Sequence, residues 1–168
     1  MSKEKPALVA IVMGSESDLP VMQGAVDIFK QFDIPFEIRV LSAHRTPDET
    51  ASYAAGARAR GIRVFIAAAG GAAHLGGVIA AYTPLPVIGV PIPSKNLNGL
   101  DSLLSIVQMP SGVPVASVAI GGAKNAALLA IQIVGTGRPE LLDQMVRFKE
   151  EMLGKVADMD RRVKEATA

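Results

Sequence analysis

The sequence has no cysteine, no tryptophan and only two histidines among its 168 residues. Without cysteine there is no disulfide, no thiol nucleophile and no thiolate metal site. An excess of basic residues is missing too, because 17 Lys and Arg face 16 Asp and Glu and leave a net charge of +1. General nucleic-acid binders usually show a clustered basic excess, so no nucleic-acid partner is expected.

Charge is nearly absent from the middle of the chain. Between Val64 and Val134 the charged residues are Lys95, Asp101 and Lys124 alone. Such a stretch is either deeply buried or buried against other subunits, and because its part at 64–81 has no charge at all, a membrane span is the alternative for the stretch. Glycine pairs and prolines interrupt it, which fits buried strands and helices better than a span of about 20 apolar residues. The N-terminus has no signal-peptide pattern, so we expect a cytoplasmic protein without a membrane partner.

The remaining composition is that of a globular domain. Hydrophobic residues make up 49% and charged residues 20%, which excludes a disordered chain. The length suits one domain that buries its own core. We therefore expect residues 1–168 to form a single domain with its core over about 7–134.

Short apolar runs alternate with helical patterns along this core. The runs are rich in Val and Ile, as in strands buried on both faces. The expected strands are residues 7–13, 36–41, 64–68, 86–90 and 113–120. The expected helices are residues 19–32, 47–60, 101–108 and 123–134, with another ending at about 82. This alternation predicts an α/β protein whose parallel sheet has helices on both faces.

Some helix boundaries carry specific signals. Thr46 is a predicted N-cap, Pro47 fits the first turn and Glu49 completes a capping box. Gly61 predicts the end of that helix. Residues 123–134 are apolar on nearly every face, so we expect that helix to be buried all round.

The last segment, residues 139–164, is rich in charge and carries an apolar stripe. The stripe has a near-heptad spacing that Lys149 interrupts. Its members are Leu142, Met145, Met152, Val156, Met159 and Val163. Such a helix either packs on its own domain or forms an arm on a neighbouring subunit. Because the core is complete near Val134, we favour the arm and hence a homo-oligomer.

Three unusual loops follow the first three expected strands. They read GSESD at 14–18, SAHRTP at 42–47 and GGAAHL at 70–75. In an open parallel sheet, ligands bind outside the carboxyl ends of the strands, where these loops meet. Both histidines, His44 and His74, therefore fall on one edge of the predicted sheet.

The first loop suits an anion. Gly14 permits a tight turn, Ser15 and Ser17 offer hydroxyls, and the next helix directs free N–H groups at the loop. Asp18 suits sugar hydroxyls as a hydrogen-bond acceptor. Neither the dinucleotide fingerprint nor the Walker pattern is present. The alternative is that Ser17 or Asp18 only caps the helix.

The second loop adds a cation and a titratable ring. Arg45 can grip phosphate oxygens in a bidentate way, or it is a solvated surface residue. His44 can exchange a proton near neutral pH, or structural hydrogen bonds hold it. Its position between Ser42 and Arg45 at a strand end favours the functional interpretation.

The third loop is small and apolar. Alanines and glycines at 67–73 leave room for a ligand against the backbone, and His74 either contacts that ligand or caps the next helix. A longer loop with Ser94, Asn96 and Asn98 either closes over the site or is an ordinary surface loop. The three loops together suggest a small monophosphate with hydroxyls and a flat uncharged part. No metal site is expected, because the histidines lack Asp or Glu partners at ligand spacing.

The chain resembles the class I N5-carboxyaminoimidazole ribonucleotide mutases of purine biosynthesis over roughly residues 7–134. The resemblance is carried by GSESD (14–18), SAHRTP (42–47), AGGAAHL (69–75), LPVIGVP (85–91), DSLLSIVQMP (101–110) and GVPVASVAIG (112–121). It implies a three-layer α/β/α fold with a parallel, flavodoxin-like sheet, and an octamer with sites at subunit junctions. It also implies conversion of N5-carboxyaminoimidazole ribonucleotide to 4-carboxyaminoimidazole ribonucleotide, without metal or organic cofactor.

The resemblance also implies roles for single residues. His44 corresponds to the general acid/base of the family. Positions that bind phosphate and ribose are Ser15, Ser17, Asp18, Ser42 and Arg45, and positions around the imidazole and the migrating carboxylate are Gly70, Gly71, His74 and Leu75. Gly14 and Ala43 complete the predicted substrate-binding set. Two departures are Gly76, where the family more often has Pro, and a loop at 121–125 that looks shorter than usual.

Two other functions are weighed against this one. Direct carboxylation of aminoimidazole ribonucleotide by CO2, as in the class II branch, is disfavoured because that branch departs from the SAHRTP and AGGAAH patterns. A flavodoxin-like module for flavin mononucleotide is disfavoured because two Tyr, five Phe and no Trp leave few rings for stacking.

Overall fold

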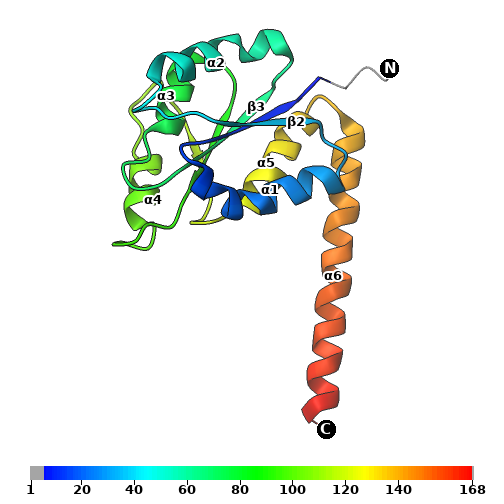
Figure 1. Cartoon of the computed structure of the whole chain (residues 1–168). Helices are drawn as coiled ribbons and strands as arrows, with labels where there is room; N and C mark the ends of the chain where they lie inside the picture. The colour runs from blue at the N-terminus through cyan, green and yellow to red at the C-terminus, as the bar shows by residue number, and fades with distance from the viewer. Residues whose placement is uncertain (1–5, 168) are drawn as a thin grey trace.

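The computed structural model describes residues 6–167. Figure 1 shows an α/β body from which one long helix extends. In chain order the elements are β1 (Val9–Met13), the 3₁₀ turn η1 (Glu16–Asp18), α1 (Leu19–Gln31), β2 (Phe36–Val40), α2 (Pro47–Arg60), β3 (Val64–Ala69), α3 (Leu75–Tyr82), β4 (Val87–Pro91), α4 (Leu100–Val107), β5 (Ala116–Ser117), α5 (Ala123–Gly135) and α6 (Pro139–Thr167).

The strands form one parallel sheet in the order β2-β1-β3-β4-β5. Ile11 of β1 lies between Ile38 of β2 and Ile66 of β3, and Ile66 is in turn paired with Ile88 of β4. After β1 the chain adds β2 on one side of that strand. It then returns and adds β3, β4 and β5 on the other side. The carboxyl ends of β1 and β3 therefore flank the switch point, where open parallel sheets bind ligands.

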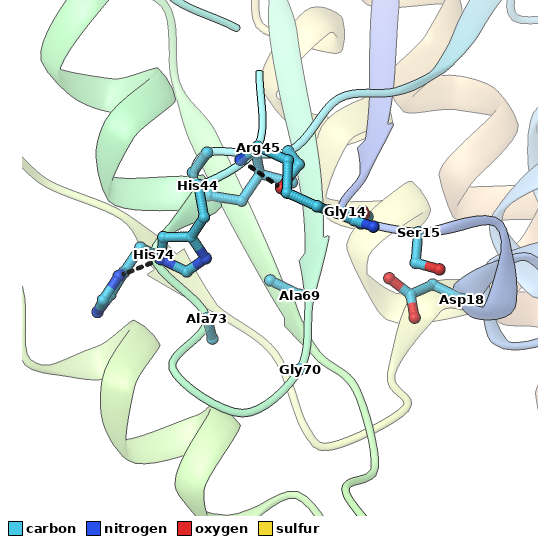
Figure 2. A pocket seen from close by; sticks show the side chains of 12 residues that line it. Gly14, Ser15, Asp18, His44, Arg45, Ala69, Gly70, Ala73 and His74 are labelled. Atoms are coloured by element: carbon cyan, nitrogen blue, oxygen red, sulfur yellow. Dashed lines mark hydrogen bonds between the residues drawn. The ribbon is translucent and has the colours of Figure 1, made fainter. Parts of the chain in front are cut away.

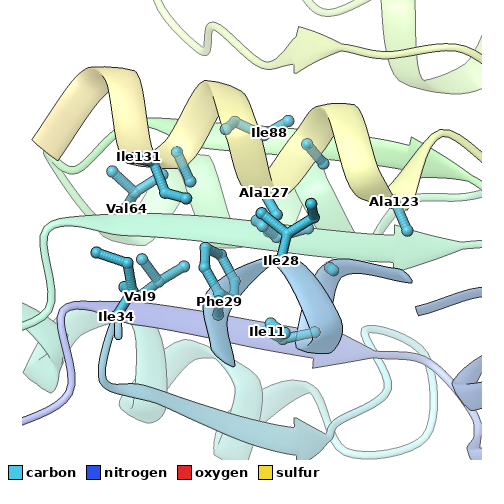
Figure 3. Close-up of a cluster of buried hydrophobic side chains, with 14 of the residues drawn as sticks. Val9, Ile11, Ile28, Phe29, Ile34, Val64, Ile88, Ala123, Ala127 and Ile131 are labelled. Atoms are coloured by element: carbon cyan, nitrogen blue, oxygen red, sulfur yellow. The ribbon is translucent and has the colours of Figure 1, made fainter. Parts of the chain in front are cut away.

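Helices cover both faces of the sheet, which confirms the three-layer α/β/α prediction. Side chains alternate along each strand, so Val9 and Ile11 of β1 face α1 and α5 (Figure 3). Ala10 and Val12 of the same strand face the opposite cluster, which includes residues of α2, α3 and α4. Phe29 of α1 is fully buried in the first cluster. Continuous apolar strands follow from this double burial.

The last strand is much shorter than expected. β5 comprises Ala116 and Ser117, paired with Ile88 and Gly89, in place of the predicted residues 113–120. Pro114 has no N–H to donate to the ladder, and β5 is an edge strand, where proline is tolerated only outside the pairing.

Two helix predictions are also wrong in detail. Thr46 does not cap α2 with its side chain. Its hydroxyl instead accepts from the Ser42 N–H at 3.0 Å and donates to the Ser42 carbonyl at 3.2 Å. The capping box is replaced by a closed turn over residues 42–46. α5 is not buried all round either, because Leu128 and Leu129 stay half-buried. Gly61, at φ +100°, does end α2 as predicted.

Helix α6 is anchored only at its beginning. Leu141 and Met145 are buried, and the Phe148 ring lies 5.5 Å from that of Phe32. Every residue from Lys149 to Thr167 is exposed in the single chain, and Figure 1 shows this part leading away from the body. In the described part of the chain, no helix combines the length and apolar character needed to cross a bilayer.

Candidate active site

A cavity of about 360 Å³ lies at the switch point of the sheet. Its size is within the range of small-molecule sites. It is lined by Gly14, Ser15, Asp18, Ser42, Ala43, His44, Arg45, Ala69, Gly70, Ala73, His74 and Leu75. Every predicted site residue except Ser17 and Gly71 is in this lining. The loops after β1, β2 and β3 thus meet around one space, as their place at the strand ends requires.

The first loop turns through Ser15. Its hydroxyl accepts from the Ser17 N–H at 3.3 Å and from the Ser17 hydroxyl at 2.9 Å, so it caps the short η1 turn. Neither Ser17 nor Asp18 caps a helix with its side chain. Gly14 does not adopt a left-handed conformation. A Cβ at Gly14 would meet nothing within 4 Å, which leaves this side of the cavity open.

Asp18 is a carboxyl held largely away from water, with 8% of its surface exposed. Burial raises the pKa of Asp18, while hydrogen bonds from the Ser17 hydroxyl and the backbone of Ser15 partly oppose this shift. Burial disfavours the charged form of the carboxyl, so a ligand that donates hydrogen bonds to the carboxylate stabilises it. Ribose hydroxyls are donors of this kind.

Replacing Asp18 with Asn is expected to raise the thermal unfolding midpoint at pH 7. The pKa of the Asp18 carboxyl is higher in the folded protein than its ordinary value of 3.8. The carboxyl therefore destabilises the fold increasingly as the pH rises from 3.8 through the folded-state pKa. Asn does not titrate. The thermal unfolding midpoints of the two proteins are therefore expected to diverge as the pH rises from about 3 to about 7. Parallel curves over that range would contradict the shift.

The second loop is closed by hydrogen bonds around Ser42. Its hydroxyl accepts from the Arg45 N–H at 3.2 Å and from Arg45 Nε at 3.4 Å. Arg45 Nη2 donates to the carbonyl of Gly14 at 2.7 Å, so the guanidinium joins the first and second loops. A cation and the Ser15 hydroxyl therefore line one space, as a shared anion site demands.

The two histidines are in direct contact with each other at one side of the cavity (Figure 2). Nε2 of His44 lies 2.7 Å from Nδ1 of His74, and the rings meet edge-on with centroids 4.8 Å apart. His44 comes from the loop after β2, and His74 from the residue before α3. His74 does not cap α3 with its side chain, which leaves its ring available to His44.

The third loop is held from behind by Ser102, a residue that the sequence analysis did not single out. Gly71 has φ +65°, and its N–H donates to the Ser102 hydroxyl at 2.9 Å. That hydroxyl donates in turn to the Ile92 carbonyl at 2.8 Å. Ser102 is fully buried on α4. The Gly71 N–H is therefore directed away from the cavity. In the sequence, the feature that could have pointed to Ser102 is a serine on the apolar face of a predicted helix.

The longer loop with Ser94, Asn96 and Asn98 does not contribute to the cavity lining. Ser94 instead donates to the Asp101 carboxylate at 2.7 Å, at the start of α4. Among residues 6–167 there is also no group of three or more His, Asp or Glu side chains placed to hold a metal ion.

Comparison with known proteins identifies the family. The model of the family described as AIR carboxylase matches residues 8–155. The chain belongs to the AIR carboxylase family. Similar curated members, all called N5-carboxyaminoimidazole ribonucleotide mutase, come from Pyrococcus horikoshii (59% identity; 98% of this chain, 93% of that protein), Saccharolobus solfataricus (65%; 88% and 94%) and Mycobacterium tuberculosis (58%; 94% and 90%).

A solved structure shares the fold. The crystal structure of Treponema denticola PurE superposes with a TM-score of 0.83 at 32% identity, covering 93% of this chain and 98% of that one. The resemblance expected from the loop motifs is thereby confirmed, and it extends beyond residue 134 into α6.

Proposed function

We propose that this chain is an N5-carboxyaminoimidazole ribonucleotide mutase, an isomerase of purine biosynthesis. It converts N5-carboxyaminoimidazole ribonucleotide to 4-carboxyaminoimidazole ribonucleotide. The observation that carries the proposal is identity of 59% and 65%, over most of the chain, to proteins of that name. The cavity supplies the groups that such a reaction needs: a ring that exchanges protons, a guanidinium and a buried carboxylate.

The reaction moves one carboxylate and one proton. The bond between the exocyclic nitrogen and the carboxylate breaks, CO2 leaves, and His44 donates the proton that this nitrogen gains. Ring carbon 4 then attacks CO2, and His44 removes the proton that carbon 4 loses. Atoms and charge balance without a redox cofactor or a metal. A single ring serving as acid and then base operates best when both its forms are populated at working pH.

Anchoring the ribose phosphate keeps the ring in place while CO2 is free. In the proposal, Arg45 and Ser15 bind the phosphate, and Asp18 accepts from the ribose hydroxyls. The buried side chains of Ala69 and Ala73 form an apolar wall beside the aminoimidazole. Held reactants combine faster than CO2 diffuses away, and the apolar wall limits its hydration.

The proposal is tested by supplying each substrate separately. Product absorbance is expected to rise with N5-carboxyaminoimidazole ribonucleotide alone, and not at a comparable rate with aminoimidazole ribonucleotide and CO2. With a ¹³C-labelled N-carboxylate and unlabelled bicarbonate in solution, most of the label is expected in the product. Faster turnover from aminoimidazole ribonucleotide and CO2 would instead assign direct carboxylation.

The proposal includes a homo-octamer in the cytoplasm, in which α6 is an arm on a neighbouring subunit. Beyond Met145, which is buried, the apolar stripe of α6 is uncovered in the single chain, with Val156 58% and Val163 63% exposed. A second uncovered apolar group surrounds α4 and includes Leu97 and Leu104, at 55% and 49%. Apolar areas of this extent favour burial against other subunits.

A charge in the α6 stripe is expected to weaken assembly. Light scattering should give the unchanged chain a mass eight times 17.5 kDa. Val156→Glu is expected to reduce that mass, because it buries a carboxylate in the contact. Lys155→Glu, on the neighbouring position of the same exposed helix, is the control and should retain the mass. Equal masses for Val156→Glu and the unchanged chain would contradict the arm.

A further inference from the structure

We propose that His74 is a positioning residue whose Nδ1 accepts a hydrogen bond from Nε2–H of His44, leaving Nδ1 of His44 to exchange the proton with substrate. This inference rests on the proposed role of His44. Its basis is the 2.7 Å contact between these two nitrogens. No further hydrogen bond of either ring is found among the described residues.

The backbone places His74 for this single contact. It is the residue before α3, with φ −74°, and its ring makes no bond to the helix N-terminus. Its neighbours on both sides, Ala73 and Leu75, are buried at 2% and 3% exposure. Buried neighbours thus hold the backbone of His74 in place, and Figure 2 shows its ring beside that of His44.

A contact between two ring nitrogens needs one hydrogen between them. Either His44 donates from Nε2 and His74 accepts at Nδ1, or the roles are reversed. The geometry alone is the same for both arrangements. The proposed chemistry distinguishes them, because His44 has to serve as acid in one step and as base in another.

Hydrogen placement on His44 decides the direction. As an acid His44 is an imidazolium with hydrogen on both nitrogens, and as a base it has lost one of them. If Nε2 keeps its hydrogen throughout, His74 accepts the same bond in both steps and does not change its own protonation. If His74 were the donor, the imidazolium would bring two N–H groups face to face at 2.7 Å.

This arrangement leaves Nδ1 of His44 as the nitrogen that gives and takes the proton. Figure 2 shows that nitrogen on the side of the ring toward Ala69 and the cavity. The other charged groups of the lining do not compete for the histidine pair. Arg45 is bonded to Gly14 and Ser42, and Asp18 to the first loop. His74 thus acts on the reaction through His44, in the manner of residues that fix a histidine tautomer.

The test uses two substitutions of nearly equal shape. His74→Asn places an amide oxygen close to the position of Nδ1 and keeps an acceptor, whereas His74→Leu removes it. His74→Leu is expected to lower kcat by about 10- to 100-fold, as for lost second-shell partners of histidine, with KM close to the unchanged value. His74→Asn is expected to recover most of that loss.

Nitrogen NMR supplies a measurement that a general loss of structure would not mimic. Because the chain has two histidines, ¹⁵N-histidine labelling gives one ring in each variant, that of His44. In the unchanged protein and His74→Asn, neutral His44 is expected to carry its hydrogen on Nε2, and in His74→Leu a mixture of tautomers.

Hydrogen on Nδ1 of neutral His44 in the unchanged protein would overturn the inference. Full kcat in His74→Leu would overturn it as well, as would equal kcat losses in His74→Leu and His74→Asn. The NMR measurement needs no substrate. Failure of the proposed function would instead be seen as an unchanged protein that does not isomerise the ribonucleotide.

Discussion

Replacing His44 with Asn is expected to lower kcat by about 10²- to 10⁴-fold, the contribution of a positioned acid–base group. Asn keeps polarity and approximate size but has no proton to exchange near neutral pH. Both proposed proton transfers pass through this one ring, so no second group of the lining replaces it. The rate is measured from product absorbance at saturating substrate.

Binding is expected to survive the same substitution. Arg45 is held by Gly14 and Ser42, and Asp18 by the first loop, without a hydrogen bond to His44. Calorimetric titration with the product should therefore give a Kd close to that of the unchanged protein. His74→Asn makes the same change on the neighbouring ring and is expected to keep most of the turnover, so the two variants separate loss of the His44 proton from loss of a ring in the cavity. Near-normal turnover by His44→Asn would show that His44 is not the general acid/base.

The central strands could be read from the sequence because their environment is uniform. β1 and β3 are covered by helices on both faces, so every position selects an apolar residue, and the runs at Val9 and Val64 stand out. At the sheet edge, the extent of a strand depends on which neighbouring residues pair with it, and the local sequence does not contain that information. β5 therefore comprises only Ala116 and Ser117, although the apolar run around Pro114 predicted a longer strand.

The cavity was predictable as a meeting of loops, and its internal bonds were not. Parallel strands all end at one edge, so residues that follow β1, β2 and β3 are brought together by topology alone. Which side chains bond there depends on distances of a few tenths of an ångström between segments far apart in sequence. The Arg45 contact to Gly14, the pair of histidines and the support from Ser102 are of this kind.

Gly89 of β4 faces Ile106 of α4, and Gly89→Ala is expected to cost about 3 kcal/mol of unfolding free energy, at the upper end for overpacking. A Cβ there would lie 2.4 Å from Cγ2 of Ile106 and 3.3 Å from Cγ1 of Val115. Ile106 is 1% exposed and branched at Cβ, so it cannot turn away into free space. Since α4 also carries Ser102, pushing this helix outward also disturbs the bond that holds Gly71.

A double variant separates this collision from a general intolerance of the strand. Ile106→Ala alone is expected to cost about 2–5 kcal/mol through the cavity that it leaves. In Gly89→Ala with Ile106→Ala, the new methyl group occupies part of that cavity, so the combined cost is expected to fall at least about 1 kcal/mol below the sum of the two single costs.

Urea unfolding at one fixed protein concentration measures all three variants, because association contributes to stability. Gly154→Ala, on exposed α6 with nothing within 4 Å of the added methyl group, is the control and should be neutral or slightly stabilising. Additive costs at positions 89 and 106 would show that the methyl group and Ile106 do not compete for the same space.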